Sequence, residues 1–367
     1  MKTLQQILGV ENMLATIQAV KSGIPIIFDP GFLTQTVGTE GDTGTYIKVE
    51  GGRKTAQQAM YGAPSKRVNL TGVKDVAVKL IHQHENQLHK PTTLLNLSSE
   101  TSEARQRLGI ETISRQTKDF KARGTNLRIS AVSSMLALGA VHFDGDGNLL
   151  SSSTGAKISI DYGIPAGNKN QLNWDGNGAI IAADWDTATT KIITHVEDLL
   201  AAAIKLTGYP ITTAYYGKNV PGFLTKNNDT LNYASQVPAM ASAIATGTIP
   251  DGLLGIQKWR PANQQFFVDQ NGDIKEMFDD DSITFTPELD MTWYEMIEGT
   301  YPVPTNLGAV TADAVAQINA NVMEARGMFG YAKLVDDPVT VEQHAGDTFL
   351  PVLKVPKAVF IAKVSGF

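Results

Sequence analysis

The side chains best suited to metal binding in this 367-residue chain are its six histidines. His84, Glu85 and His89 resemble a zinc-protease motif, but that motif needs two histidines four positions apart on one helix face. Here they lie five positions apart, so they cannot share such a face. His82 and His84 would share one face of a strand and could ligate a metal, although polar surface positions explain them more simply. We expect no metal and no cofactor.

Two aspartate-rich stretches could in principle surround a calcium ion, because alternate oxygen side chains can converge on a hard cation. They are Asp144/Asp146/Asn148 and Asp269/Asn271/Asp273. Leu149 and Ile274 stand where an EF-hand requires glycine, and no glutamate closes either loop. Hairpin turns therefore account for both stretches.

Catalytic chemistry has little support in the sequence. The absence of cysteine excludes thiol nucleophiles, disulfides and thiolate metal sites. No phosphate-binding loop, dinucleotide fingerprint or nucleophile elbow occurs. Asp184, Asp186 and His195 could form an acid–base cluster, but Asp186 is better used as a helix cap. We expect a protein that is not an enzyme.

The charge is distributed unevenly along the chain. Residues 1–140 carry 17 Lys and Arg against 11 Asp and Glu, and residues 141–367 carry 14 against 26, for a net charge of −6. An acidic protein of this kind is not a sequence-reading nucleic-acid binder. A basic front half and an acidic back half would let one copy lie over a neighbour, so the sequence predicts head-to-tail association.

The N-terminal half predicts elements that extend from a compact body. Residues 3–21 read as an amphipathic helix, and residues 24–33, broken by two prolines, as an extended arm. Alternating residues predict strands at 45–50 and 76–80, joined by a polar loop too long for a compact domain. A proline-free pattern then predicts a charged helix from Ser98 or Ser99 to about Leu138, about 60 Å long at about 1.5 Å per residue.

The C-terminal half predicts a mixed α/β region followed by strands. The expected elements are a hairpin at 141–150, strands at 157–162, 179–183 and 211–216, a helix from Asp186 or Thr187 to Gly208, an Asn-Gly hairpin at 266–275, a helix at 311–326 and a strand-rich tail at 330–364. The apolar runs are far too short to span a membrane, and the N-terminus lacks the pattern of a signal peptide. We expect synthesis in the cytoplasm.

Two stretches of sequence resemble a known family. The first is Thr43-Gly44-Thr45-Tyr46-Ile47-Lys48-Val49-Glu50 with Met60-Tyr61-Gly62-Ala63-Pro64, and the second is Asp337-Pro338-Val339-Thr340-Val341-Glu342-Gln343 with Phe349-Leu350-Pro351-Val352-Leu353-Lys354-Val355-Pro356. These stretches and the order of elements resemble the lambda-type major capsid protein family of tailed phages, also called major capsid protein E. The resemblance implies an α+β fold of the Hong Kong 97 type.

The resemblance also implies a domain organisation and a set of partners. The implied segments are an N-terminal arm (1–40), an extended loop (41–93), a peripheral domain with the spine helix (94–178), an axial domain (179–324) and peripheral return strands (325–367). Implied partners are further copies of the chain as hexamers and pentamers, a portal, a scaffold, packaged double-stranded DNA held without sequence specificity, and in some relatives a decoration protein. The implied location is the capsid shell of the virion, reached by assembly in the host cytoplasm.

The charge pattern selects candidate contact residues between subunits. They are Lys48, Arg53, Lys54, Lys66 and Arg67 on the loop and Arg115, Lys118 and Arg123 on the long helix. Two other functions stay open at this stage: an encapsulin-like shell around protein cargo, and an α/β hydrolase that uses Asp184 and His195.

Overall fold

The computed structural model describes most of the chain. The described residues are 29–49, 73–89, 103–173, 178–262, 266–268, 274–304, 322–336 and 339–366, with the single residues 13, 17, 92 and 272. None of the helices within these ranges is long and apolar enough to cross a membrane.

One sheet, which we call the β18 sheet, is organised around a 15-residue strand. Its members are β1 (Thr36–Gly38), β4 (Ile81–Leu88), β14 (Tyr294–Glu298), β17 (Phe329–Asp336) and β18 (Val339–Leu353). β18 pairs antiparallel with β4, β14 and β17, and β1 joins β14 in parallel. Side chains of β18 alternate between two faces, because successive residues of a strand point to opposite sides. Its odd-numbered residues from Val341 to Asp347 are buried.

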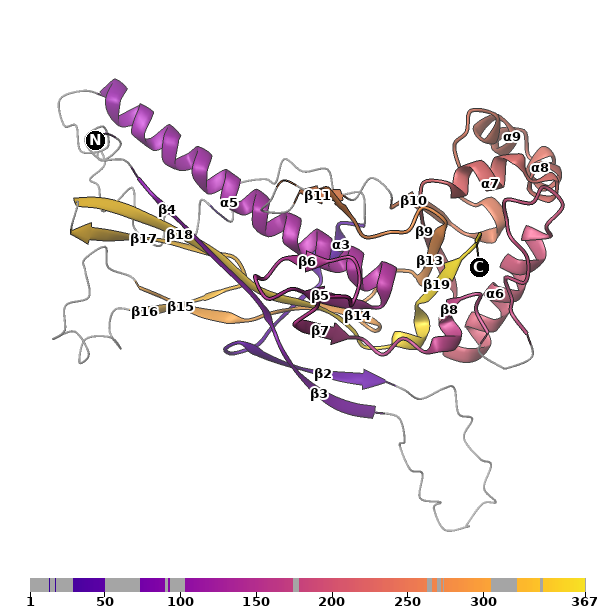
Figure 1. Cartoon of the computed structure of the whole chain (residues 1–367), viewed down its shortest axis with the longest axis horizontal. Helices are drawn as coiled ribbons and strands as arrows, with labels where there is room; N and C mark the ends of the chain where they lie inside the picture. The colour runs from indigo at the N-terminus through magenta and orange to yellow at the C-terminus, as the bar shows by residue number, and fades with distance from the viewer. Residues whose placement is uncertain are drawn as a thin grey trace, which may run out of the picture.

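A single long helix, α5 (Glu103–Leu138), lies along one face of this sheet (Figure 1). No proline interrupts it, and it continues through Gly109 and Gly124. Much of its first half is exposed, whereas residues 128–136 are all buried. The helix ends at Gly139, whose φ of 70° and whose amide bond to the Met135 carbonyl (3.0 Å) form a left-handed cap.

A second sheet, which we call the β9 sheet, lies at the C-terminal end of α5 (Figure 1). Its order is β10 (Lys258–Pro261), β9 (Ile211–Tyr216), β13 (Ser282–Pro287), β19 (Phe360–Lys363) and β8 (Lys169–Asn170). All residues of β9 and β13 are buried, as expected for strands covered on both faces. The helices of this part are α6 (Ile192–Thr207), α7 (Val220–Lys226), α8 (Asn228–Ser235) and α9 (Pro238–Ala245).

Small two- and three-stranded units and short helices complete the described structure. The hairpins are β2 (Thr43–Val49) with β3 (Val73–Lys79), β11 (Phe266–Val268) with β12 (Ile274–Glu276), and β15 (Thr300–Pro304) with β16 (Val322–Arg326). The remaining elements are β5 (Ala140–Phe143), β6 (Leu149–Leu150), β7 (Ile158–Asp161), α3 (Gly31–Thr34) and three 3₁₀ turns at Ala166–Asn168, Leu253–Gly255 and Pro356–Ala358. The β2–β3 hairpin projects away from the body of the molecule (Figure 1).

Each sheet has its own apolar core. The core under α5 contains the fully buried Phe32, Trp293, Tyr294 and Phe349, and its aromatic rings meet edge to face. Phe32 is placed there by α3, and the Tyr294 hydroxyl donates to the Phe32 carbonyl at 2.7 Å. The core of the β9 sheet is formed by α6 and α7 against β9, β13 and β19. Trp185 is completely buried in this second core.

Several predicted elements are confirmed. The strands expected at 45–50 and 76–80 correspond to β2 and β3, which pair antiparallel in register Thr43 with Lys79. The hairpins expected at 141–150 and 266–275, the strands at 157–162 and 211–216 and the strand-rich tail are present. The long helix is present from Glu103. The helix expected at 3–21 lies outside the described residues except for Met13 and Ile17, which are helical and buried.

Other predicted elements are wrong. Residues 179–183 are irregular, with Ile180 and Ile181 amides bonded to the carbonyls of Leu172 and Gln171. The following helix begins at Ile192 instead of Asp186 or Thr187. Residues 187–190 form a tight turn, in which the Thr190 amide donates a hydrogen bond to the Thr187 carbonyl.

Two further corrections concern strand and helix type. Residues 322–326, expected as the end of a helix, form β16 because β15 supplies a pairing partner. Residues 31–33, expected in an extended arm, form the short helix α3 together with Thr34.

The strand pairings link segments that the sequence assigned to different domains. β14, within 179–324, pairs with β18 of the return strands. β19, within 325–367, pairs with β13 in the β9 sheet, and β8, within 94–178, pairs with β19. The chain thus passes repeatedly between the two sheets.

Candidate functional site

The candidate metal residues do not converge on a metal site. His89 is buried, and its Nε2 lies 3.1 Å from Gln343 Oε1. His82 and His84 are exposed residues whose rings lie against Phe329 of the β18 sheet. Among the described residues, no group of three or more His, Cys, Asp or Glu is arranged to hold a metal ion.

The first aspartate-rich stretch is a hairpin turn that satisfies its own polar groups. Asp144 Oδ1 accepts the amides of Asp146 and Asn148 at 2.9 and 2.8 Å, and Oδ2 accepts the Asn148 side chain at 2.9 Å. These hydrogen bonds, the one from the Asn148 side chain foremost, lower the pKa of Asp144. The second stretch, at Asp269, Asn271 and Asp273, lies outside the described residues.

The candidate acid–base pair has a structural role in the second core. Trp185 Nε1 donates to His195 Nδ1 at 3.2 Å, which uses the imidazole as the acceptor of a buried indole. Burial lowers the pKa of His195, while the nearby Asp198 and Asp229 oppose that shift. No hydrogen bond among the described residues joins Asp184 to His195. The geometry gives the hydrolase alternative no nucleophile, base and orienting group in contact.

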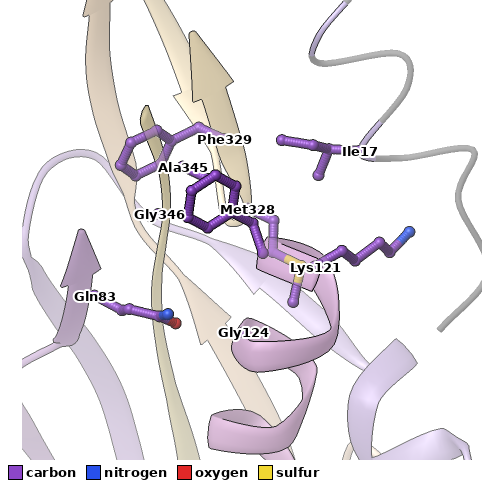
Figure 2. A pocket seen from close by; sticks show the side chains of 9 residues that line it. Ile17, Gln83, Lys121, Gly124, Met328, Phe329, Ala345 and Gly346 are labelled. Carbon is purple, nitrogen blue, oxygen red and sulfur yellow. The ribbon is translucent and has the colours of Figure 1, made fainter. Parts of the chain in front are cut away.

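The cavity beside Lys121 and Gly124 of α5 is too small for a substrate (Figure 2). It has a volume of about 10 Å³ and lies among Ile17, Gln83, Lys121, Gly124, Met328 and Phe329. Such a space holds about one water molecule at most. The buried Gly124 allows Met328 to approach α5, because a Cβ at position 124 would lie 3.3 Å from Met328 Cε.

The base of the β2–β3 hairpin is fixed to the body of its own chain. Gly44 and Tyr46 are buried on one face of β2, and Thr43, Thr45 and Ile47 are exposed on the other. The Val49 amide donates to the Lys354 carbonyl at 2.7 Å. Burial raises the pKa of the Tyr46 hydroxyl. The hairpin therefore leaves the body in a defined direction.

The candidate subunit contacts fall into three groups in the structure. Arg53, Lys54, Lys66 and Arg67 lie outside the described residues. Lys48 is half-buried, and its Nζ lies 2.5 Å from the position that a Cβ at Gly163 would occupy.

Arg115, Lys118 and Arg123 are exposed on α5. Arg123 Nη1 also donates to Glu85 Oε2 of β4 at 3.2 Å. The structure thus leaves these three side chains accessible on the outer side of the helix.

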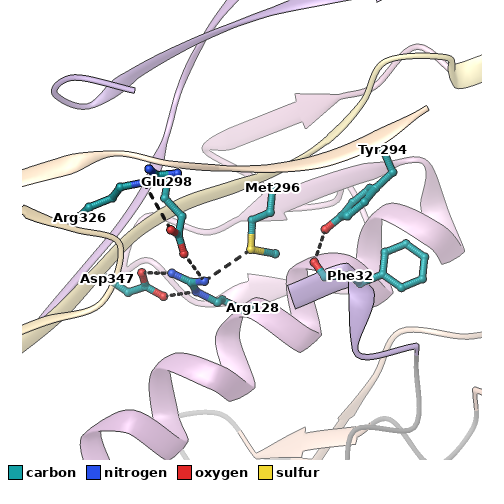
Figure 3. A network of polar contacts seen from close by, with 7 residues as sticks. All are labelled: Phe32, Arg128, Tyr294, Met296, Glu298, Arg326 and Asp347. Carbon is teal, nitrogen blue, oxygen red and sulfur yellow. Dashed lines mark hydrogen bonds and ion pairs between the residues drawn. The ribbon is translucent and has the colours of Figure 1, made fainter. Parts of the chain in front are cut away.

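A buried ion-pair network joins α5 to the β18 sheet, and sequence reasoning missed it (Figure 3). Arg128 donates from Nε and Nη2 to the two carboxylate oxygens of Asp347, both at 2.6 Å, and from Nη1 to Glu298 Oε1 at 2.7 Å. Arg326 Nε lies 3.6 Å from Glu298 Oε2. The Arg128 guanidinium also lies 5.2 Å from the centroid of the Phe349 ring.

Burial and charge act in opposite directions on this network. Burial opposes the charged form of Arg128, but attraction and hydrogen bonds from Asp347 and Glu298 outweigh it and raise its pKa. The side chains of Arg128 and Asp347 are only 7% and 1% exposed, so water does not screen the pair. Two parallel hydrogen bonds fix the guanidinium plane as well as its position. The network therefore sets the register of α5 on β18.

A long helix is locked to a strand-rich body, a hairpin projects from that body, and basic side chains remain exposed along the helix. The chain belongs to the phage major capsid protein E family, whose family model matches residues 9–364. It is a major capsid protein of a phage and a component of the virion shell.

Comparison with solved structures supports the fold. The chain is similar to the proposed capsid protein of a prophage from E. coli CFT073, with a TM-score of 0.54, 14% identity, and coverage of 98% of this chain and 99% of the other. It is also similar to a phage-related protein from Bordetella bronchiseptica RB50, with a TM-score of 0.49, 8% identity, and coverage of 97% of each chain. The first of these similarities, together with the family match, gives the expected α+β capsid fold of the Hong Kong 97 type. No curated protein matches the sequence significantly.

Proposed function

We propose that the chain self-assembles as hexamers and pentamers into an icosahedral head that encloses double-stranded DNA. The observation that carries this proposal is the β2–β3 hairpin, which packs on the body through one face and leaves Thr43, Thr45 and Ile47 exposed on the other. A projecting element with a fixed base can reach a neighbouring copy without loss of orientation. Membership in the capsid family supports the same assembly.

The contacts between subunits would be electrostatically complementary. Arg53, Lys54, Lys66 and Arg67 lie between β2 and β3 in sequence, and the region after residue 140 has 12 more acidic than basic side chains (26 against 14). Opposite potentials steer association and exclude wrong registers. Arg115, Lys118 and Arg123 would extend the basic surface along α5. Lys48, which lies beside Gly163, would contribute by fixing the direction of the hairpin.

We also propose a domain organisation and a set of partners. Residues 1–40 would form the arm and 41–93 the extended loop, with the peripheral domain at 94–178 and 325–367 and the axial domain at 179–324. In this organisation β14 and β19 are the strands that exchange between the two domains. A portal, a scaffold and in some assemblies a decoration protein would bind the shell, which would form in the host cytoplasm. Its acidic net charge suits a wall that holds DNA without binding its sequence.

The test is to reverse the loop charges with Arg53→Glu, Lys54→Glu, Lys66→Glu and Arg67→Glu together. The matched control exchanges Arg and Lys at the same four positions and keeps every charge. We expect the reversed variant to fold but to form no shells by negative-stain electron microscopy, while the control assembles like the natural chain. Normal shells from the reversed variant would refute the proposed complementarity.

A second outcome separates the phage head from an encapsulin-like compartment. Shells purified from cells of the natural host should contain DNA and no single dominant protein cargo. A folded protein cargo in stoichiometric amount would favour the nanocompartment.

A further inference from the structure

The face of the β18 sheet opposite α5 carries a cluster of histidine and aromatic side chains. We call it the histidine–aromatic layer, and its members are His82, His84, Tyr301, Phe329, Tyr331 and His344. In an antiparallel pair, residues directly opposite one another share a face. His84 opposes Gly346, and Gly346 opposes Phe329 on the next strand, while His344 opposes Tyr331. Three strands therefore present this layer on one side.

The rings of the layer are stacked on one another and on the β15–β16 hairpin. Tyr301 of β15 stacks on Phe329 with centroids 4.3 Å apart and planes 4° apart, and on His82 at 5.0 Å. Tyr331 stacks on His344 at 4.5 Å and 7°. The layer thus holds the hairpin against the sheet.

The imidazoles have few polar partners and lie close together. The centroids of His84 and His344 are 5.3 Å apart. His82 Nδ1 lies 2.9 Å from Thr348 Oγ1, and His84 Nε2 lies 3.4 Å from the Tyr331 hydroxyl. The His344 side chain is only 11% exposed, so a positive charge on it would be poorly hydrated, whereas His82 and His84 are exposed at the edge of the cluster.

Some charged groups around the layer favour protonation of its histidines, and others oppose it. Glu342 lies 3.2 Å from His344 Nε2 and favours protonation of both His84 and His344. Asp347 and Asp42 favour protonation of His82, whereas Lys333 on β17 disfavours it at His344.

Partial burial of the rings nevertheless has the largest effect on the pKa of all three histidines. It lowers the pKa of His82, His84 and His344 below the ordinary value of 6.5, and the two neighbouring imidazoles further lower that of His84. Glu85 and Gln83 lie on the other face of β4, toward α5, where Glu85 is paired with Arg123.

We propose that the histidine–aromatic layer is an acid-sensitive latch. Protonation of His82, His84 and His344 below about pH 6.5 releases the β15–β16 hairpin from β17, and β4 from β18. β4 follows β3 after the single residue Leu80, so its release would also free the base of the β2–β3 hairpin. The latch is a property of the folded chain itself and stands whether or not a shell forms.

The direction of the pH effect follows from proton linkage. The opened layer has ordinary histidines and binds protons at about pH 6.5, whereas the closed layer binds them only at lower pH. The stability of the layer is therefore complete above pH 6.5 and is lost as the pH falls below that value. Each histidine that takes up a proton only on opening raises the opening constant by up to about tenfold per pH unit.

The test is hydrogen–deuterium exchange of the full chain between pH 7.5 and 5.0, corrected for the intrinsic exchange rate. We expect peptides from β4, β15, β16 and β17 to lose about tenfold or more protection between pH 6.5 and 5.5. Peptides from β9 and β13 in the other sheet should keep theirs. Equal protection of the layer at both pH values would overturn the proposal.

Variants distinguish the layer from other titrating groups, including the buried His89. His84→Phe with His344→Phe keeps two aromatic rings but removes two titratable imidazoles, so only His82 remains and the acid loss between pH 6.5 and 5.5 should fall to about fivefold or less. The control His142→Phe lies in another sheet and should leave the acid loss unchanged. An acid loss in the double variant as large as in the natural chain would contradict the latch.

A second variant keeps the proposal testable if the double variant does not fold. Glu342→Gln removes the charge that helps the closed layer to accept protons, so the acid loss should become larger. An unchanged or smaller loss would contradict the proposed role of the layer.

Discussion

Replacing Arg128 with methionine should destabilise the chain far more than any exposed charge on the same helix. The substitution leaves the Asp347 carboxylate, 1% exposed, and Glu298, 16% exposed, without their shared cation. It removes three charge-assisted hydrogen bonds of 2.6, 2.6 and 2.7 Å. Removing one partner of a buried ion pair costs about 3–5 kcal/mol, because a buried charge remains uncompensated.

The matched control is Arg123→Met on the same helix. Arg123 is 67% exposed and pairs with Glu85 at 3.2 Å, so its loss should cost about 0.2–1 kcal/mol. The assay is urea unfolding followed by circular dichroism, with hydrogen exchange of α5 and β18 amides as a local readout. The expected difference between the variants is about 2–4 kcal/mol.

A compensating variant checks the physical reason. Arg128→Met combined with Asp347→Leu removes both buried charges of the fork and should recover much of the lost stability, since apolar replacements of buried pairs are often neutral or better. The reasoning is refuted if Arg128→Met and Arg123→Met differ by less than about 1 kcal/mol, or if the double variant is less stable than Arg128→Met alone.

Three other predictions concern packing, hydrogen bonding and charge. Gly346→Ala should cost about 1–3 kcal/mol in urea unfolding, because its Cβ would lie 2.4 Å from both the Gln83 carbonyl and the Phe329 ring. The control Gly222→Ala, in α7 with no atom within 4 Å of the new Cβ, should be neutral or stabilising by up to about 1 kcal/mol, and equal effects at the two sites would contradict the packing. His195→Ala should cost about 1–3 kcal/mol by orphaning the Trp185 indole N–H, whereas no change in stability would deny that bond its structural role. Raising the salt concentration to about 1 M should slow assembly by screening the basic and acidic surfaces, and salt-independent light-scattering kinetics would argue against steering by charge.

Local sequence patterns predicted the elements that depend on neighbours along the chain. The α5 helix lacks proline and is followed by Gly139, two features that are visible in the sequence, and the structure gives this glycine the positive φ of a helix cap. The alternation at 45–50 and 76–80 predicted β2 and β3, and the Asn-Gly pair predicted the β11–β12 hairpin.

Failures occurred where distant segments decide the structure. Residues 322–326 have a pattern compatible with a helix, yet pairing with β15 makes them a strand. The apolar Ala179–Ala183 segment lacks a strand partner among the described residues and instead bonds to a nearby turn at Gln171 and Leu172. Propensity is a weak guide in both places, because tertiary contacts override it.

The functional features also divide into those that the sequence shows and those that depend on contacts between distant residues. The exposed basic residues of α5 and the charge difference between the two halves were readable from composition. The Arg128–Asp347 fork joins residues 219 positions apart, and the His82–Thr348 contact joins residues 266 positions apart. No spacing in a single sequence encodes such pairs. The proposed latch therefore could not be predicted from the sequence, because its residues come together only through strand pairing.

Imaging of the purified protein is the strongest test of whether this chain assembles by itself into shells. Purified protein should be fractionated by size and examined by negative-stain electron microscopy across a range of protein concentration and salt. Self-assembly predicts closed particles tens of nanometres across, or rings of five and six subunits. A single 39.5 kDa species at every concentration and salt, with no rings, would contradict self-assembly of the chain.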